Sequence, residues 1–177
     1  AYGLEDSGAK LAIFDEERAA SIEAGADEEN PVNPFFDDQL VLCATSWLAG
    51  NPKRAEQAAA GEWDLTIVDE AHHLEWSVEG SSPEYDVVES IARNSAGLLL
   101  LTATPEQLGQ EGHFARLRLL DPARFSDLEE FIHESEQFRA ISDLADRLNT
   151  EGELGKEDLK SIESLLGNDL AEKLAEV

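Results

Sequence analysis

Leu65-Thr-Ile-Val-Asp-Glu-Ala-His72 is the stretch that decides the fold of this 177-residue chain. An apolar, β-branched run leads directly into two adjacent carboxylates, Asp69 and Glu70. Such a run predicts a strand buried in a parallel sheet. Nucleotide-hydrolysing α/β domains place carboxylates at the carboxyl end of a central strand, where they handle magnesium and the attacking water. Taken alone, the pair is more often an ordinary strand end before a polar helix start.

A second stretch of the same form, Gly97-Leu-Leu-Leu-Leu-Thr-Ala-Thr-Pro105, lies downstream. Two apolar runs that each end in polar residues predict two parallel strands that deliver side chains to one edge of a sheet. Thr102 and Thr104 have a simpler alternative role, as strand-end hydroxyls that satisfy backbone groups. We favour the functional interpretation because the two stretches occur together.

These motifs resemble those of the superfamily-two helicase-like ATPases. Asp69-Glu-Ala-His72, a DEAH box, is similar to the second helicase motif (Walker B), and Thr102-Ala-Thr104 is similar to the third. Residues 62–77, 98–109 and 112–125 are similar, in more detail, to bacterial members of the SWI/SNF-like branch that act with RNA polymerase. The clear similarity covers roughly the central half of the chain.

The resemblance implies a role for each motif residue. Asp69 would hold the Mg²⁺ of Mg-ATP through its water shell, and Glu70 would activate the attacking water. The other motif residues would couple the nucleotide state to lobe movement: His72, Thr102, Ala103 and Thr104. The resemblance also implies a longer, cytoplasmic bacterial protein that binds the RNA polymerase core, translocates on DNA or RNA, and frees polymerase for further transcription.

The sequence contains no Gly-x-x-x-x-Gly-Lys-Ser/Thr phosphate loop, and none of its five lysines lies in a glycine-rich turn. That loop cradles the ATP phosphates, and in the family it precedes the Asp-Glu-Ala-His strand. We therefore expect a piece of the first motor lobe without its phosphate-loop strand. We also expect negligible ATPase activity from this chain by itself.

Residues 1–125 are predicted to form an α/β fold, a partial RecA-like lobe with a parallel sheet flanked by helices, because strand and helix patterns alternate. Besides the two motif strands, the patterns predict strands at residues 11–14 and 40–44 and helices at 53–60 and Pro83–Ala92. Residues 15–34 are acidic and predict a loop or a frayed helix. The hydroxyls of Thr45 and Ser46 are expected to cap a helix.

From residue 126 the pattern changes to helix alone. Apolar residues recur at helical spacing up to residue 148, and again over residues 159–166 and at 170 and 174. Residues 126–177 are therefore predicted to be a helical appendage that leads towards the second lobe. We favour ordinary core packing for these apolar stripes over partner binding.

The chain carries 39 acidic residues against 13 Lys and Arg, a formal net charge of −26. Nucleic acids attract proteins through Lys and Arg, so this chain is expected to bind DNA or RNA weakly or not at all. A local patch of Arg116, Arg118 and Arg124 is the alternative, but we expect these arginines to be solvated ion-pair partners. The acidity also fits a salt-rich habitat, because a high net charge keeps proteins soluble.

The remaining signals narrow the class of protein. The single cysteine, Cys43, lies in an apolar run and is expected to pack rather than react. No apolar run is long enough to span a membrane. Adjacent His72 and His73 lack the spacing of a zinc-protease helix. Two alternatives stay open: a different superfamily-two helicase or translocase, and a non-enzymatic acidic module that binds a protein partner.

Overall fold

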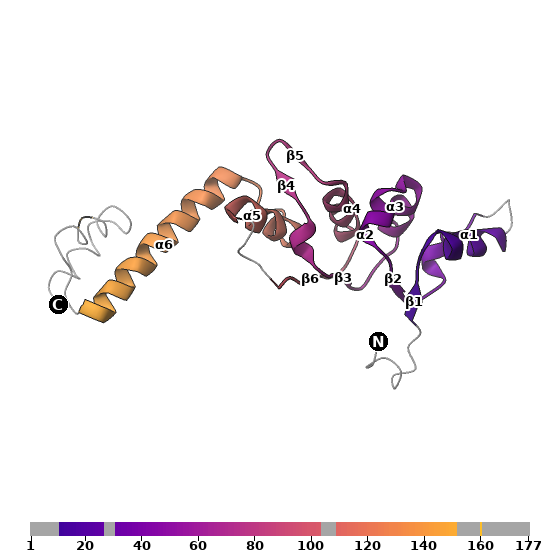
Figure 1. Cartoon of the computed structure of the whole chain (residues 1–177), viewed down its shortest axis with the longest axis horizontal. Helices are drawn as coiled ribbons and strands as arrows, with labels where there is room; N and C mark the ends of the chain where they lie inside the picture. The colour runs from indigo at the N-terminus through magenta and orange to yellow at the C-terminus, as the bar shows by residue number, and fades with distance from the viewer. Residues whose placement is uncertain (1–10, 27–30, 104–108, 152–159, 161–177) are drawn as a thin grey trace, which may run out of the picture. The chain divides into compact units, whose positions relative to one another are not determined.

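The computed structural model describes residues 11–26, 31–103, 109–151 and 160. The chain forms two compact units, residues 1–124 and 125–177, and each is described by itself. Strands and helices are interspersed along the first unit, and Figure 1 labels its strands and α-helices. They are β1 (Leu11–Ile13), α1 (Glu16–Ala24), η2 (Pro34–Phe36), β2 (Leu40–Leu42), α2 (Thr45–Ala49), α3 (Pro52–Ala59), β3 (Thr66–Val68), η3 (Ala71–His73), β4 (Trp76–Ser77), β5 (Gly80–Ser81), α4 (Pro83–Ala92), β6 (Leu98–Leu100) and α5 (Gly109–Leu120).

The motif strands pair as the sequence predicts. β3 and β6 lie side by side and parallel, with Thr66 opposite Leu98 and Val68 opposite Leu100. β1 and β2 form a second parallel pair, and β4 and β5 form a short antiparallel hairpin. The α/β class with parallel strands and flanking helices is therefore confirmed, as a partial RecA-like lobe.

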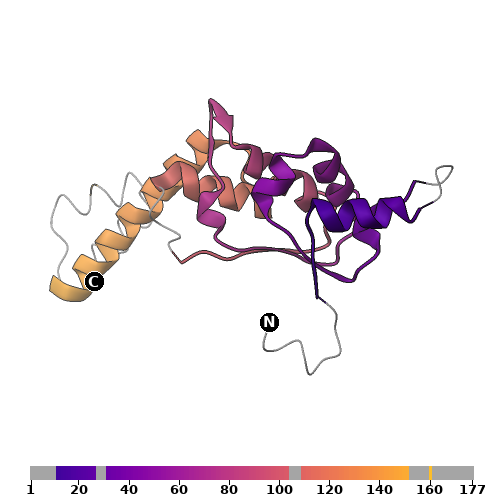
Figure 2. The ribbon, with the colours of Figure 1, turned by 45° about the vertical axis from the view of Figure 1, so that its right-hand side comes forward.

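The helices of this unit cover one side of the parallel strands β1, β2, β3 and β6, which run along the lower side of the unit in Figure 2. Ala12 and Val68 point into the helices and are buried. The opposite face stays open, so Ile13 is 70% exposed and Ile67 56% exposed. The strand predicted to be buried at residues 65–68 is thus buried on its inner face only, because among the described residues no element packs on the outer face.

Two apolar clusters hold the unit together. One joins β1, η2 and the helices α1 to α4, and its aromatic centre is the stacked pair Phe14 and Phe35, whose ring centroids are 4.6 Å apart. The other joins β3, η3, α4 and α5 around the buried side chain of Tyr85. Cys43 packs against the first cluster, and burial raises the pKa of its thiol to about 11, which fits a packing role.

Two local expectations are corrected. Residues 16–24 form a regular helix rather than a loop or a frayed helix, because Asp15 caps it by accepting a hydrogen bond from the Arg18 N–H at 2.9 Å. At α2 the hydroxyls of Thr45 and Ser46 do not cap. The residue at the cap position is Ala44, whose side chain has no oxygen to accept the bond.

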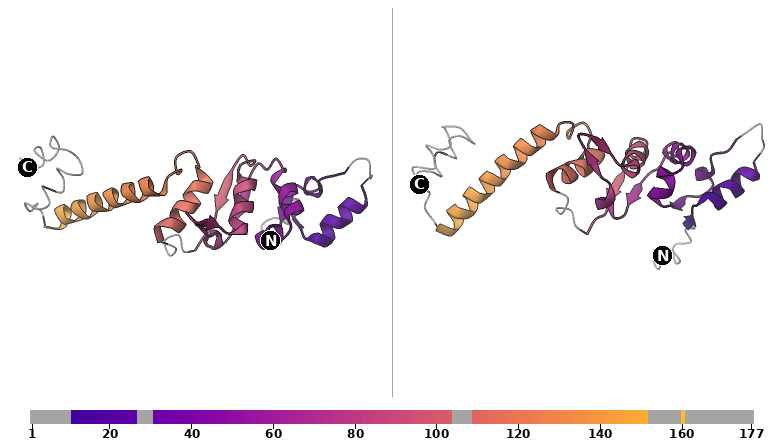
Figure 3. Two further views of the ribbon diagram at one scale, coloured as in Figure 1. Left: turned by 90° about the horizontal axis from the view of Figure 1, so that it is seen from above. Right: turned by 45° about the horizontal axis from the view of Figure 1, so that its top comes forward.

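Within the described residues of the second unit lies a long helix, α6 (Leu128–Glu151), continuous in both views of Figure 3. This confirms the helical pattern predicted up to residue 148. The apolar sets at residues 159–166, and at 170 and 174, lie outside the described residues. None of the helices in the described ranges is long and apolar enough to cross a membrane.

Candidate functional site at the carboxyl edge of strands β3 and β6

Backbone hydrogen bonds bring the two sequence motifs to one edge of a sheet. The Leu101 N–H donates to the Val68 carbonyl at 2.8 Å, and the Ala71 N–H donates to the Leu101 carbonyl at 2.8 Å. The backbone of Leu101 is therefore hydrogen-bonded to Val68 and Ala71, the residues on either side of the Asp69-Glu70 turn. The turn and the following Thr102 leave the sheet at the same edge, as expected for parallel strands.

Glu70 has an unusual backbone. Its φ of 53° and ψ of 42° are left-handed, and among the described residues it is the one non-glycine residue with positive φ. This conformation is disfavoured for a residue with a Cβ and persists where neighbouring structure enforces it. Here the turn is closed on itself, because Asp69 Oδ1 accepts the Glu70 N–H at 2.9 Å.

The side chains of the turn face solvent. Asp69 and Glu70 are both exposed, and His72 is half-buried. Nδ1 of His72 is shielded from solvent and lies 3.1 Å from Glu70 Oε2, without the alignment of a hydrogen bond. The contact is an ion pair only when the imidazole is protonated. The His73 ring packs against the His72 ring with centroids 4.0 Å apart and the planes tilted by 40°.

The third-motif residues are described only in part. Thr102 is half-buried and Ala103 is exposed. Thr104 lies outside the described residues. The structure thus brings five of the six proposed site residues to one sheet edge: Asp69, Glu70, His72, Thr102 and Ala103. Their catalytic and coupling roles stay predictions.

An ionic cluster on another surface escaped the sequence analysis. Arg54 is buried on α3, and its guanidinium bonds Glu16 Oε1 and Glu23 Oε1, each at 2.6 Å. Hydrogen bonds from Arg54 first, then from Gln57 and Lys53, lower the pKa of Glu23 to about 2. This cluster lines a hollow between α1 and α3, away from the carboxylate turn. We interpret this cluster as a structural link between α1 and α3, because its opposite charges neutralise one another.

The three arginines considered as a nucleic-acid patch do not form one. Arg116 is 5% exposed, so the prediction that it is a solvated ion-pair partner is wrong. It lies on the inner face of α5, and burial lowers its pKa. Arg118 is one-third exposed and lies over the Trp76 ring, 5.1 Å from its centroid.

Comparison with known proteins shows extensive similarity to one protein. The RNA polymerase-associated protein RapA of Vibrio parahaemolyticus is 53% identical over 164 residues, which is 93% of this chain and 16% of that protein. The chain is homologous to a segment of RapA. RapA of Pseudomonas fluorescens is 48% identical over 168 residues, and RapA of Erwinia tasmaniensis is 44% identical over 165 residues.

The similarity to RapA extends well beyond the two motifs. It covers about nine-tenths of the chain, whereas the clear similarity found in the sequence alone covers about half. The chain spans about one sixth of the length of the RapA proteins that it matches. No family model matches the chain.

Proposed function

We propose that this chain supplies the magnesium-binding and water-activating edge of an ATPase that moves on nucleic acid and associates with RNA polymerase. The observation that carries the proposal is the placement of Asp69, Glu70 and Thr102 at one edge of paired parallel strands. The RapA relatives, named as RNA polymerase-associated proteins, support the choice of partner. The proposed place of action is the bacterial cytoplasm, and the proposed outcome is return of polymerase to transcription.

The exposed carboxylate of Asp69 suits Mg²⁺, which prefers oxygen ligands and keeps several waters. When bound, Mg-ATP would supply the charge neutralisation of phosphoryl transfer. Glu70 is adjacent and exposed, so its carboxylate can accept a proton from water. Because the chain has no phosphate loop, we propose that turnover needs phosphate contacts from other segments of a longer protein.

The test is a chimera, in which this segment replaces its counterpart in full-length RapA of Vibrio parahaemolyticus. Glu70→Gln should lower the rate of ATP hydrolysis by about 10²-fold or more, because an amide cannot accept the proton. Binding of ATP should be unchanged. Glu75→Gln is the matched control, since Glu75 is also exposed and lies five residues further along the chain. An inactive chimera, or full turnover in Glu70→Gln, would contradict the proposal.

A further inference from the structure

The segment that follows the carboxylates is held from two sides. On one side the Ala71 N–H donates to the Leu101 carbonyl of the neighbouring strand. On the other side Ala71 and Leu74 are buried in the cluster that contains Ala115 and Leu119 of α5. The left-handed Glu70 lies directly before this segment, and a disfavoured backbone conformation of this kind persists where neighbouring structure enforces it.

Trp76 extends the contact between this segment and α5. Its ring packs against Phe114 of α5, with centroids 5.3 Å apart and an angle of 48° between the planes. The guanidinium of Arg118, one turn further along α5, lies 5.1 Å from the Trp76 centroid, within cation–π range. Arg118 Nη2 is 3.8 Å from Glu89 Oε1 on α4, which ties the contact to a second helix.

α4 and α5 are themselves joined by a buried hydrogen bond. The Tyr85 hydroxyl donates to the Ala115 carbonyl at 3.1 Å. The two helices and the β4–β5 hairpin therefore form one packed group. In the sequence, the Asp69–His72 segment leads into β4, and the Thr102 segment precedes α5. Both motifs are therefore connected along the chain to this packed group.

We propose that Trp76 and Arg118 are positioning residues for Glu70, acting through the buried turn at Ala71 and Leu74. Neither side chain touches the proposed reacting atoms. Their contribution is to keep the turn packed on α5, so that Glu70 stays in its left-handed conformation and its carboxylate faces the attacking water. The inference rests on the proposed function and deepens it.

The test uses the RapA chimera and compares truncating with conservative variants. Trp76→Ala should lower kcat for ATP hydrolysis about tenfold while KM for ATP changes less than about twofold, because the base is displaced but phosphate contacts are intact. Trp76→Phe keeps an aromatic ring against Phe114 and should restore most of kcat. Arg118→Ala should lower kcat in the same way, and Arg118→Lys should restore part of it.

Arg93→Ala is the control, because Arg93 pairs with the same Glu89 but is not part of the Trp76 contact. It should leave kcat unchanged. A second readout is hydrogen exchange at the Ala71 amide, which should be about tenfold faster in Trp76→Ala while amides of α3 keep their protection. If Trp76→Ala does not fold, Arg118→Ala carries the test, since Arg118 is partly exposed.

Unchanged kcat and unchanged Ala71 exchange in folded Trp76→Ala or Arg118→Ala would overturn the proposal. Equal losses in Trp76→Ala and Trp76→Phe, or faster exchange throughout the unit, would also overturn it by showing general destabilisation. Failure of the proposed function is a separate result. In that case the chimera has no ATPase activity, or Glu70→Gln keeps it, while the Ala71 amide still reports whether the turn is held.

Discussion

At the scale of single residues, the charged side chains of this chain occupy two different environments. Asp69 and Glu70 are exposed at a strand end, whereas Arg54 is buried and satisfied by Glu16 and Glu23. A buried guanidinium with two carboxylates costs little only while the set is complete, because a lone buried charge is expensive. The first arrangement suits chemistry on a bound ligand, and the second suits the attachment of α1 to α3.

The Arg54 cluster predicts a specific response to acid. The pKa of Glu23 is lowered to about 2, chiefly by its hydrogen bonds to Arg54, so its stabilisation is present above the ordinary pKa near 4.5. It is lost as the pH falls from about 5 towards 2. Glu23→Gln should therefore remove on the order of 1–2 kcal/mol at neutral pH, a figure reduced for solvent screening, and almost nothing at the acid end.

Urea denaturation of both proteins across this pH range measures the difference. The comparison cancels the relief of repulsion among the other carboxylates, since both chains share it. A difference that stays constant down to pH 2 would contradict the assignment. Glu17→Gln is the matched control, because Glu17 lies on the same helix and is exposed.

At the scale of elements, the short helices α1 and α2 differ in how their first turns are capped. α1 begins at Asp15, whose carboxylate accepts a backbone N–H of the first turn. α2 begins at Ala44, which has the extended φ of −82° and ψ of 131° typical of a cap residue but no side-chain acceptor. The hydroxyls predicted to cap α2 lie one and two residues too late, inside the helix.

The uncapped start of α2 leads to a stabilising substitution. Ala44→Ser places a hydroxyl at an exposed position whose backbone already has cap geometry. The free energy of unfolding should rise by about 1 kcal/mol, measured by urea denaturation. Ala20→Ser, at an exposed interior position of α1, should instead be neutral or slightly destabilising. Equal effects of the two substitutions would show that α2 gains nothing from a cap.

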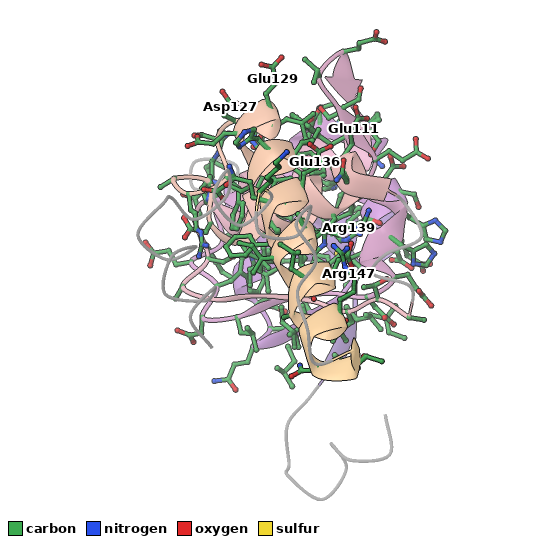
Figure 4. The ribbon with its side chains drawn as sticks, turned by 90° about the vertical axis from the view of Figure 1, so that its left-hand side faces the viewer. Glu111, Asp127, Glu129, Glu136, Arg139 and Arg147 are labelled. Atoms are coloured by element: carbon green, nitrogen blue, oxygen red, sulfur yellow. The ribbon has the colours of Figure 1, made fainter. Side chains whose placement is uncertain are left out.

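At the scale of the whole molecule, the net charge and the exposed apolar surface have opposite effects on self-association. The net charge of −26 makes copies of the chain repel, while the outer strand face exposes Ile13, Ile67 and Leu99. The second unit adds to the acidity, because α6 has seven carboxylates against two arginines. Figure 4 shows Glu129, Glu136, Arg139 and Arg147 projecting from this helix.

This opposition predicts salt-dependent self-association of the chain studied alone. Salt screens the repulsion between exposed carboxylates but leaves the attraction of apolar surface, so association should increase with ionic strength. Sedimentation velocity at low and high salt measures it. Ile67→Lys should reduce the association, because it places a charge on the open face. Association that weakens with salt would contradict this account.

The sequence by itself determined the parallel α/β class, the strand and helix at residues 98–100 and Pro83–Ala92, and the shared edge of the two motifs. Hydrophobic runs, turn residues and paired polar ends act locally, and these features follow from them. Only the tertiary structure decided the left-handed backbone of Glu70, the burial of Arg54 and Arg116, and the open outer face of the strands. Those features depend on which segments, far apart in the chain, pack against one another, and no local pattern contains that information.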